Sequence, residues 1–279
     1  MNMRRHRLQN AVGRGAALTL MGLLAYPVAR WLAGQWLTNE YYSHGVLVPL
    51  VSAYLAWRAV HRPRIASEPA NTALALLGGG AGLYLVGEAW AARYLSALAL
   101  LLIASGLIGF LSGWATLRRM AFPLAYLTFA VPFPFVDRLA VTAGTLTARG
   151  AAALVRTLGV AAINEGGRVT LESCSLVVGA PCSGLRSLVA LLALAAVWAY
   201  LVRGRWLARV ALLATAIPLA AGTNLLRITS LLWVADHWGA ETALRYYHDL
   251  SGPVFFALAL AGLLGVSWGL GCRDLCQDI

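Results

Sequence analysis

Long apolar segments follow one another along this chain, and they limit what it can fold into. A helix needs about 20 apolar residues to cross the ~30 Å hydrocarbon core of a bilayer. About eight segments approach that length: 16–36, 44–60, 72–90, 94–114, 120–136, 184–202, 207–229 and 252–270. Only 12% of the 279 residues are charged, whereas a soluble domain carries about 25%. We therefore expect one integral membrane domain over residues 1–279, an all-α polytopic membrane protein with about eight transmembrane helices.

The first apolar segment follows a basic start, as in a signal peptide. Residues 1–14 carry four arginines, at positions 4, 5, 7 and 14. The apolar run that follows continues for about 20 residues, as a spanning helix requires, and no small-x-small cleavage site leads into polar sequence. We expect a retained first span behind a cytoplasmic tail, residues 1–15.

The net charge of +11 indicates membrane topology rather than nucleic-acid binding, and no nucleic-acid partner is expected. Arginines gather between the apolar segments, which is typical of cytoplasmic loops under the positive-inside rule. With the N-terminus inside, thirteen arginines fall on the inner side and nine on the outer side. This pattern predicts a multi-pass protein of a bacterial inner membrane, with both termini, including a tail at residues 271–279, in the cytoplasm.

The longest segment between predicted spans, residues 137–183, falls on the outer, extracytoplasmic side. Residues 138–158 are apolar with three arginines and several threonines, which favours a helix lying in the membrane interface. A turn signal then falls at Gly166-Gly167. Val169 and Leu171 follow it, and then Leu176, Val177 and Val178, so we expect a β-hairpin or ribbon that leads to Cys182.

Helix geometry places three reactive residues at one depth. Cys182 lies 21 residues before Arg203, which is ~30 Å along a helix, and Arg227 lies 18 residues after Arg209, which is ~27 Å. His248 immediately precedes the last apolar segment. If the arginine-rich loops mark the inner surface, then Cys182, Arg227 and His248 all lie near the outer surface.

These three side chains form a set that can perform nucleophilic catalysis. A thiolate is the attacking species of a cysteine, histidine can take the thiol proton and later protonate a leaving amine, and an arginine can stabilise an oxyanion. Ser183 follows the cysteine at the start of a predicted helix, and Asn224 lies three residues before Arg227 on the same helical face. The alternative interpretation is a small buried cysteine and an interfacial histidine with no catalytic role.

Five short segments resemble a known family when they are taken in order. "PCSGLRS" (181–187), "NLLRI" (224–228) and "HDLSG" (248–252) resemble the three signature segments of the exosortase/archaeosortase family. "YYSHGVLVPL" (41–50) is similar to its early Ser-His-Gly segment, and "VPFPFVDRL" (131–139) is similar to its mid-chain proline segment. The resemblance runs from about residue 36 to residue 256.

The resemblance implies a membrane cysteine protease or transpeptidase with its active site facing the periplasm. Its substrates would be membrane-anchored proteins with a C-terminal sorting signal, namely a Pro-Glu-Pro type motif, a transmembrane helix and a basic tail. The resemblance also allows transfer of the cleaved substrate protein to a surface acceptor. The family's proposed catalytic residues match Cys182, Arg227 and His248.

Other polar residues have less certain roles. Arg186 lies one helical turn after Cys182 and is a candidate for substrate binding or for an interfacial anchor. His44 belongs to a matching segment, where it supports the site or anchors a loop. Cys174 is expected to be free, because a disulfide with Cys182 would remove the nucleophile.

No metal or other cofactor is expected. Cys272 and Cys276 form C-x-x-x-C without histidine partners, which is not the spacing of a metal site, so we interpret them as structural or incidental.

Two functions from other classes remain open from the sequence. A small transporter would need ionisable residues at mid-span and repeated halves, and Glu88 is the one candidate, near the outer end of its span. A non-enzymatic factor for surface polysaccharide export would use the same three residues structurally. Replacement of Cys182 distinguishes both from a thiol protease.

Overall fold

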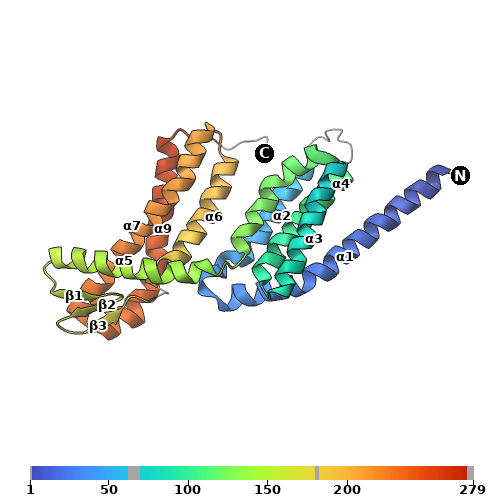
Figure 1. Cartoon of the computed structure of the whole chain (residues 1–279). Coiled ribbons are helices and arrows are strands. Elements are labelled where there is room, and N and C mark those ends of the chain that lie inside the picture. Colours follow the sequence, from blue (N-terminus) through green and yellow to red (C-terminus); the bar gives the residue numbers. More distant parts are fainter. Residues whose placement is uncertain (1, 62–69, 180–181, 275–279) are drawn as a thin grey trace. The chain divides into compact units, whose positions relative to one another are not determined.

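The computed structural model describes residues 2–61, 70–179 and 182–274, apart from the side chains of residues 2–14 and 16–18. The chain divides into two compact units, Met1–Pro132 and Phe133–Ile279 (Figure 1). Both are built mainly from helices, as the apolar segments predicted, and each unit is described by itself. That they belong to one integral membrane domain stays a prediction.

The first unit contains four α-helices joined by short 3-10 turns. In order these are α1 (Asn2–Thr38), η1 (Glu40–Val46), α2 (Leu47–Val60), η2 (Asn71–Ala73), α3 (Leu74–Ala89), α4 (Arg93–Tyr126) and η3 (Leu127–Ala130). Helix α4 is interrupted at Gly113, whose φ of 81° and ψ of 169° are not helical. Glycine adopts such a positive φ without the penalty that a Cβ would bring.

Close packing of α3 against the first half of α4 depends on small residues. A Cβ on Gly80 would lie 2.8 Å from Ile103 Cγ1, and one on Gly106 would lie 2.7 Å from the Leu77 nitrogen. Glycines at such positions let two helix backbones approach closely in a membrane protein. Gly80 and Gly106 lie at such positions, whereas Gly78, Gly79 and Gly82 have open space beside them.

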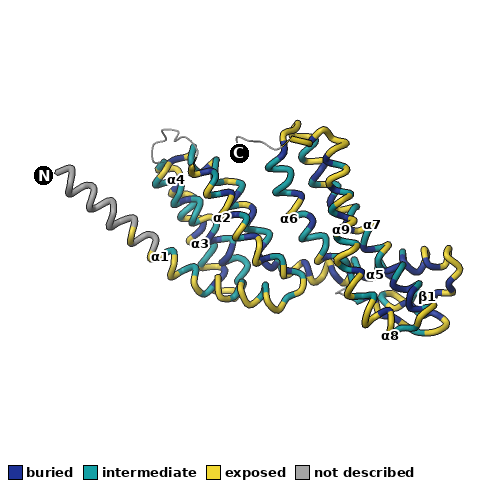
Figure 2. The backbone as a smooth tube through the Cα atoms, turned by 180° about the vertical axis from the view of Figure 1, so that it is seen from behind, coloured by how far each residue is buried: buried dark blue, intermediate teal, exposed yellow. Residues whose placement is uncertain are grey.

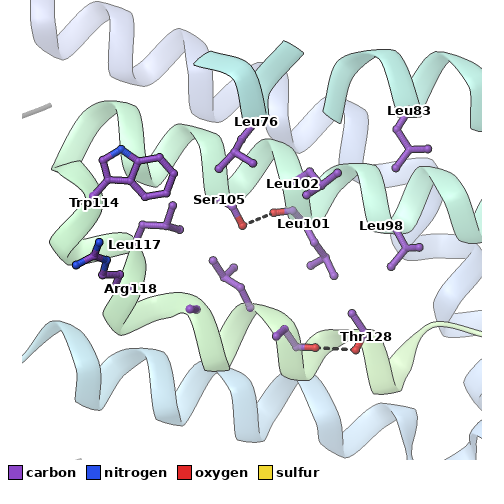
Figure 3. Close-up of a pocket in the computed structure, with 13 residues that line it drawn as sticks. Leu76, Leu83, Leu98, Leu101, Leu102, Ser105, Trp114, Leu117, Arg118 and Thr128 are labelled. Atoms are coloured by element: carbon purple, nitrogen blue, oxygen red, sulfur yellow. Dashed lines mark hydrogen bonds between the residues drawn. The ribbon is translucent and has the colours of Figure 1, made fainter. Parts of the chain in front are cut away.

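An apolar cavity of about 670 Å³ lies between α3 and the two halves of α4 (Figure 3). Leu98 and Leu102 line it from before Gly113, and Leu117 and Leu124 line it from after Gly113. The chain therefore folds back at this glycine, and predicted spans 94–114 and 120–136 are the two limbs of one interrupted helix.

Four helices among the described residues are long and apolar enough to cross a bilayer: Asn71–Ala89, Arg93–Ala130, Trp206–Trp238 and Ala240–Gly269. They account for five of the predicted spans, because Arg93–Ala130 contains most of two. Eight transmembrane helices are not confirmed. The apolar helix at Leu185–Leu201 has 17 residues and α2 has 14, which leaves both short of a full crossing.

The second unit carries the remaining elements. They are α5 (Phe135–Thr157), β1 (Ala162–Glu165), β2 (Arg168–Leu171), β3 (Ser175–Val177), α6 (Leu185–Leu201), α7 (Trp206–Trp238), α8 (Ala240–Thr242), η5 (Ala243–Tyr247) and α9 (His248–Gly269). The helix predicted at 138–158 is therefore present as α5. Its location in the membrane interface stays a prediction.

A small antiparallel sheet in the order β1-β2-β3 confirms the predicted ribbon and adds one strand to it. The β1–β2 turn falls at Gly166-Gly167, as expected, with a φ of +67° at Gly166. Val169, Leu171 and Leu176 are buried on one face of the sheet and pack with α5 and α7. The sheet is therefore attached to the helices by its inner face.

Two apolar clusters hold the helices of this unit in place, and Figure 2 shows their buried stretches. One joins α5 and the sheet to the second half of α7, where Ile228 and Leu232 are fully buried. The other joins α6, the first half of α7 and α9 through Leu191, Leu212 and Leu263. Helix α7 belongs to both clusters, so its position relative to the other helices is set along most of its length.

Candidate active site

Cys182 lies just before the first turn of α6 and is held there by its main chain. Its carbonyl oxygen accepts a hydrogen bond of 3.0 Å from Asn224 Nδ2 of α7, and its N–H donates to the Gly179 carbonyl at 3.0 Å. Gly184 follows with a φ of +79°, and a Cβ at this position would lie 2.6 Å from Asn224 Cγ. The sequence therefore needs glycine there, both for the backbone conformation and for the contact with Asn224.

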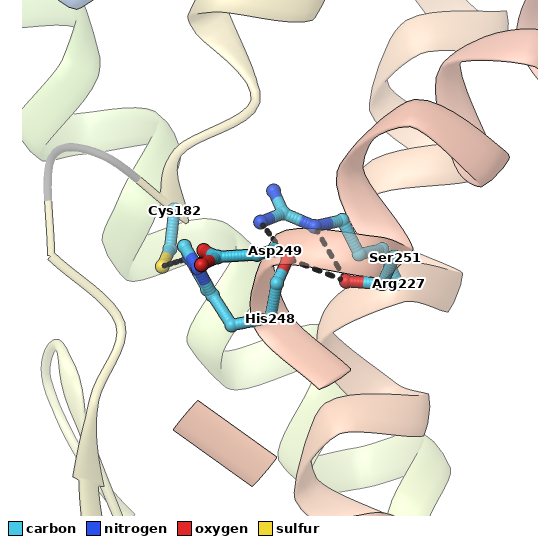
Figure 4. A network of polar contacts seen from close by, with 5 residues as sticks. All are labelled: Cys182, Arg227, His248, Asp249 and Ser251. Carbon is cyan, nitrogen blue, oxygen red and sulfur yellow. Dashed lines mark hydrogen bonds and ion pairs between the residues drawn. The ribbon is translucent and has the colours of Figure 1, made fainter. Parts of the chain in front are cut away.

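His248 is the first residue of α9, and its imidazole faces the cysteine (Figure 4). Cys182 Sγ and His248 Nε2 are 3.7 Å apart, and the other ring nitrogen, Nδ1, is 3.1 Å from Asp249 Oδ1. When Nδ1 carries the ring proton and donates a hydrogen bond to this carboxylate, the lone pair of Nε2 is able to accept the thiol proton. The His248 side chain is 30% exposed and that of Asp249 is 84% exposed, so the carboxylate is well hydrated.

Arg227 lies inside α7 rather than at its end. We expected the helix to end near this residue, but α7 continues to Trp238, because the apolar cluster with α5 and the sheet covers its last turns. Arg227 Nε donates to Ser251 Oγ at 3.2 Å, and Nη2 makes a longer contact of 3.5 Å with the His248 carbonyl oxygen. No bond to the remaining nitrogen, Nη1, occurs among the residues that the structure describes.

Ser251 connects the arginine to the histidine. It is only 3% exposed, accepts the bond from Arg227 Nε, and donates to the His248 carbonyl oxygen at 3.0 Å. A second link runs from Tyr247 Oη to Ser230 Oγ at 2.8 Å, and Ser230 Oγ donates to the Arg227 carbonyl oxygen at 2.8 Å. The first turn of α9, through Ser251, and the residue before it, Tyr247, are therefore both linked to α7.

The structure brings Cys182, Arg227, His248 and Asn224 together. Their catalytic or supporting roles stay predictions. Ser183 is 5% exposed, and its Oγ accepts a 3.4 Å bond from the Leu185 N–H at the start of α6.

Arg186 and His44 are not joined to these contacts. Arg186 is exposed in the first turn of α6, and within the described part of the chain no group is bonded to its guanidinium. His44 belongs to the first unit, where its Nε2 is 3.2 Å from the Phe129 carbonyl oxygen. A role for either residue in the site stays a prediction.

Sequence reasoning missed Asp249 and Ser251. Both belong to the segment HDLSG, which drew attention only for its histidine. The signal was available, because a serine three residues after a histidine at a helix start lies on the same face and one turn further. That Ser251 would meet Arg227 depended on how α7 packs against α9, which no local pattern gives.

The cysteines agree with expectation where they are described. Neither Cys174 nor Cys182 forms a disulfide within the described residues. Cys272 is buried and its sulfur fills the space beside Gly204. Cys276 lies outside the described residues. No group of three His, Cys, Asp or Glu side chains suited to a metal ion occurs in the described ranges.

The arrangement places a thiol, an imidazole and a fixed positive charge close together, where the start of α6 meets α7 and α9. Arginine stays protonated in proteins, so the charge at Arg227 is permanent. This is the constellation that acyl transfer requires: a nucleophile beside a base, and donors for an oxyanion.

Comparison with known families agrees with this chemistry. The chain matches a family described as transmembrane exosortase over residues 36–265. Neither a curated protein nor a solved structure matches it significantly. The match covers both units of the chain and includes every candidate residue of the site.

Proposed function

Because this chain belongs to the transmembrane exosortase family and is a membrane protein, we propose that it is a cysteine endopeptidase and transpeptidase that cleaves C-terminal sorting signals. The protein that carries the signal is called the client below. Its signal is proposed to comprise a Pro-Glu-Pro type motif, a transmembrane helix and a basic tail. The observation that carries the proposal is the 3.7 Å contact between Cys182 Sγ and His248 Nε2.

In the proposed reaction, His248 Nε2 takes the proton of the Cys182 thiol as the thiolate attacks the carbonyl carbon of the scissile peptide bond. The carbonyl oxygen becomes an oxyanion, and the Arg227 guanidinium donates hydrogen bonds to it. The carbon–nitrogen bond then breaks, and His248 gives its proton to the leaving amine. The client is left as a thioester on Cys182, while its C-terminal helix is released.

The second half-reaction regenerates the enzyme. A second nucleophile, water or a group on a surface acceptor, gives its proton to His248 and attacks the thioester carbonyl. Cys182 leaves as a thiolate and regains its proton from His248. Asp249 keeps the imidazole oriented through both halves, because it bonds the nitrogen that does not face sulfur.

The location proposed for this reaction is the periplasmic face of a bacterial inner membrane, with both termini of the enzyme in the cytoplasm. The arginine distribution supports this orientation, since the groups at 203–209 and 118–119 would then lie inside. A client anchored by its own helix would reach the site by diffusion in the bilayer, and tethering raises the effective concentration of the scissile bond.

The test is cleavage of a reporter protein fused to such a C-terminal signal and coexpressed with the chain. Cys182→Ala should abolish cleavage, a fall of about 10³-fold or more as for other covalent catalysts, while the protein still accumulates. His248→Ala should do the same. Cys174→Ala is the matched control, a second free cysteine of the same unit, and should cleave like the wild type. Cleavage that survives Cys182→Ala would exclude the thiol mechanism and favour a transporter or an export factor.

A further inference from the structure

The outer edge of β3 carries main-chain groups that the sheet does not use. Leu171 N–H donates to the Cys174 carbonyl, and Val178 N–H donates to the Gly167 carbonyl. Hydrogen-bonded pairs alternate along an antiparallel ladder, so the pairs Thr170–Ser175 and Arg168–Val177 are the unbonded ones. The N–H and C=O groups of Ser175 and Val177 therefore point away from β2.

Solvent reaches the residues that carry these groups. Ser175 and Val177 are exposed, the latter 64%, whereas Leu176 between them is 5% exposed and faces the core. The structure gives their outward main-chain groups no hydrogen-bond partner within residues 2–61, 70–179 and 182–274. An open strand edge of this kind accepts another extended peptide.

The edge leads directly to the nucleophile. Val177 precedes Gly179 by two residues, and the Gly179 carbonyl bonds the Cys182 N–H at 3.0 Å. Val177 is therefore within roughly 15 Å of Cys182, a distance that about five extended residues span. A peptide paired with β3 would therefore lie within a few residues' reach of Cys182.

We propose that the edge of β3 binds the client's polypeptide beside the scissile bond by adding it to the sheet as a fourth strand. This inference rests on the proposed function and specifies how its substrate is held. The ligand is an extended, unmodified peptide main chain, which Ser175 and Val177 contact through their N–H and C=O groups. Strand addition of this kind takes its affinity from the main chain and leaves selectivity to alternate side chains.

The extended form also suits the chemistry. In a helix each peptide carbonyl is bonded within its own chain and is surrounded by side chains, whereas a strand bonded along one edge leaves its other side open. A paired client would therefore present its carbonyl carbon to Cys182 while its neighbouring residues are fixed. Because the paired residues are already fixed, less entropy is lost when the bound client reaches the transition state.

The first test removes one donor from the edge. In Val177→Pro the N–H disappears, and proline is tolerated where the N–H of an edge strand faces away from its neighbour. Cleavage of the reporter should fall about tenfold, the effect of one lost hydrogen bond with the client. Val177→Thr is the matched comparison, because it changes the side chain and keeps the N–H, and it should lose less activity than Val177→Pro. Equal rates for Val177→Pro and the wild type would overturn the proposal.

The second test does not depend on cleavage or on tolerance of proline. A Cys182→Ala variant that also lacks the other three cysteines receives a single new one, Val177→Cys, and is paired with reporters that carry single cysteines around the scissile bond. Side chains on one face of a sheet recur every second residue, so disulfides should form at alternate reporter positions. Ile163→Cys is the matched control, since Ile163 is also 64% exposed but lies on β1, two strands away.

The two proposals fail in different ways. A reporter that the wild type does not cleave contradicts the proposed function. A reporter that is cleaved, yet forms disulfides with Val177→Cys and Ile163→Cys alike or without an alternating pattern, contradicts only the strand pairing.

Discussion

Arg227 is held at two of its nitrogens, and both contacts lead to the same turn of α9. Nε bonds the buried Ser251 hydroxyl, and Nη2 approaches the His248 carbonyl oxygen. A guanidinium is planar and presents its donors in a rigid fork, so fixing one edge aims the other. In the proposed mechanism the aimed edge meets the developing oxyanion.

Arg227→Lys is expected to fail although it keeps the charge. A lysine has one nitrogen on a flexible stem and cannot bond Ser251 and an oxyanion together. The cleavage rate of the reporter should fall about 10²-fold or more, as when an oxyanion donor is lost. Arg156→Lys, at an exposed arginine of the same unit, is the control and should have a small effect. A lysine variant near wild-type activity would mean that Arg227 supplies charge alone.

Ser251→Ala should lower the cleavage rate at saturating reporter without preventing accumulation. It leaves Arg227 Nε without its acceptor, which costs about 1–3 kcal/mol in a buried site, and it frees the guanidinium to rotate. The control is Ser267→Ala on the same helix. Ser267 is also buried and bridges a side-chain donor, Trp198 Nε1, to a carbonyl oxygen, that of Cys272. If both variants lose the same thermal stability but only Ser251→Ala cleaves the reporter more slowly, Ser251 has a positioning role. Equal cleavage rates for the two variants would contradict that role.

At the scale of elements, the start of α6 sets where the thiol lies. Three consecutive residues perform different tasks there: Cys182 is held by Asn224, Ser183 Oγ accepts a bond from the Leu185 N–H, and Gly184 is the N-cap residue with the positive φ. The Asn224 side chain packs directly on the glycine, so α6 and α7 cannot separate or slide without moving the nucleophile.

Gly184→Ala is expected to destabilise the protein and displace Cys182. The positive φ alone costs about 1–3 kcal/mol for a residue with a Cβ, and the contact of 2.6 Å with Asn224 Cγ adds to it. Thermal unfolding in detergent should occur at a lower temperature, and cleavage should be nearly lost. Gly265→Ala in α9 has open space and no positive φ, so it should be neutral or slightly stabilising. Similar behaviour of the two variants would show that the α6 start tolerates a Cβ.

Much at this scale was readable from the sequence, and the exceptions have physical reasons. Apolar length located α3, α6, α7 and α9, and the Gly166-Gly167 pair located the hairpin. The break at Gly113 and the extension of α7 to Trp238 were not foreseen, because both depend on what packs beside them. The strand that was not foreseen is β1, which precedes the Gly166-Gly167 turn, whereas the residues of β2 and β3 belonged to the predicted ribbon. Cys182, Arg227 and His248 were found through chemistry and resemblance, but their buried connector Ser251 appears only after the helices are packed.

At the scale of the whole molecule, the proposed cleavage would occur at a fixed distance from the bilayer. The family match spans both units, while the contacts among Cys182, Arg227 and His248 lie entirely in the second. Four helices of the described chain are able to cross a membrane, and α7 and α9, which carry Arg227 and His248, belong to them. A client anchored by its own helix therefore meets a site whose depth is set by the enzyme's spans.

Inserting about three residues between the client's motif and its transmembrane helix should reduce cleavage steeply. The insertion moves the scissile bond by up to ~10 Å in extended chain, and catalysis requires placement to within about hydrogen-bond reach. The same residues inserted before the motif leave the depth unchanged and should have little effect. The measurement is the fraction of reporter cleaved in each case. Equal cleavage of both insertions would show that depth does not select the bond.

The way in which Cys182 and His248 are held affects which substitutions this fold tolerates during evolution. Asn224 bonds the carbonyl of Cys182, and Ser251 and Arg227 bond the carbonyl of His248, so none of these bonds involves the thiol or the imidazole. Every amino acid has the same carbonyl. Descendants that exchange the cysteine or the histidine for an inert residue would therefore keep the main-chain bonds that hold these two positions. If the proposed function and strand pairing hold, such proteins would still bind clients without cutting them, and a single codon change would turn the proposed enzyme into a receptor.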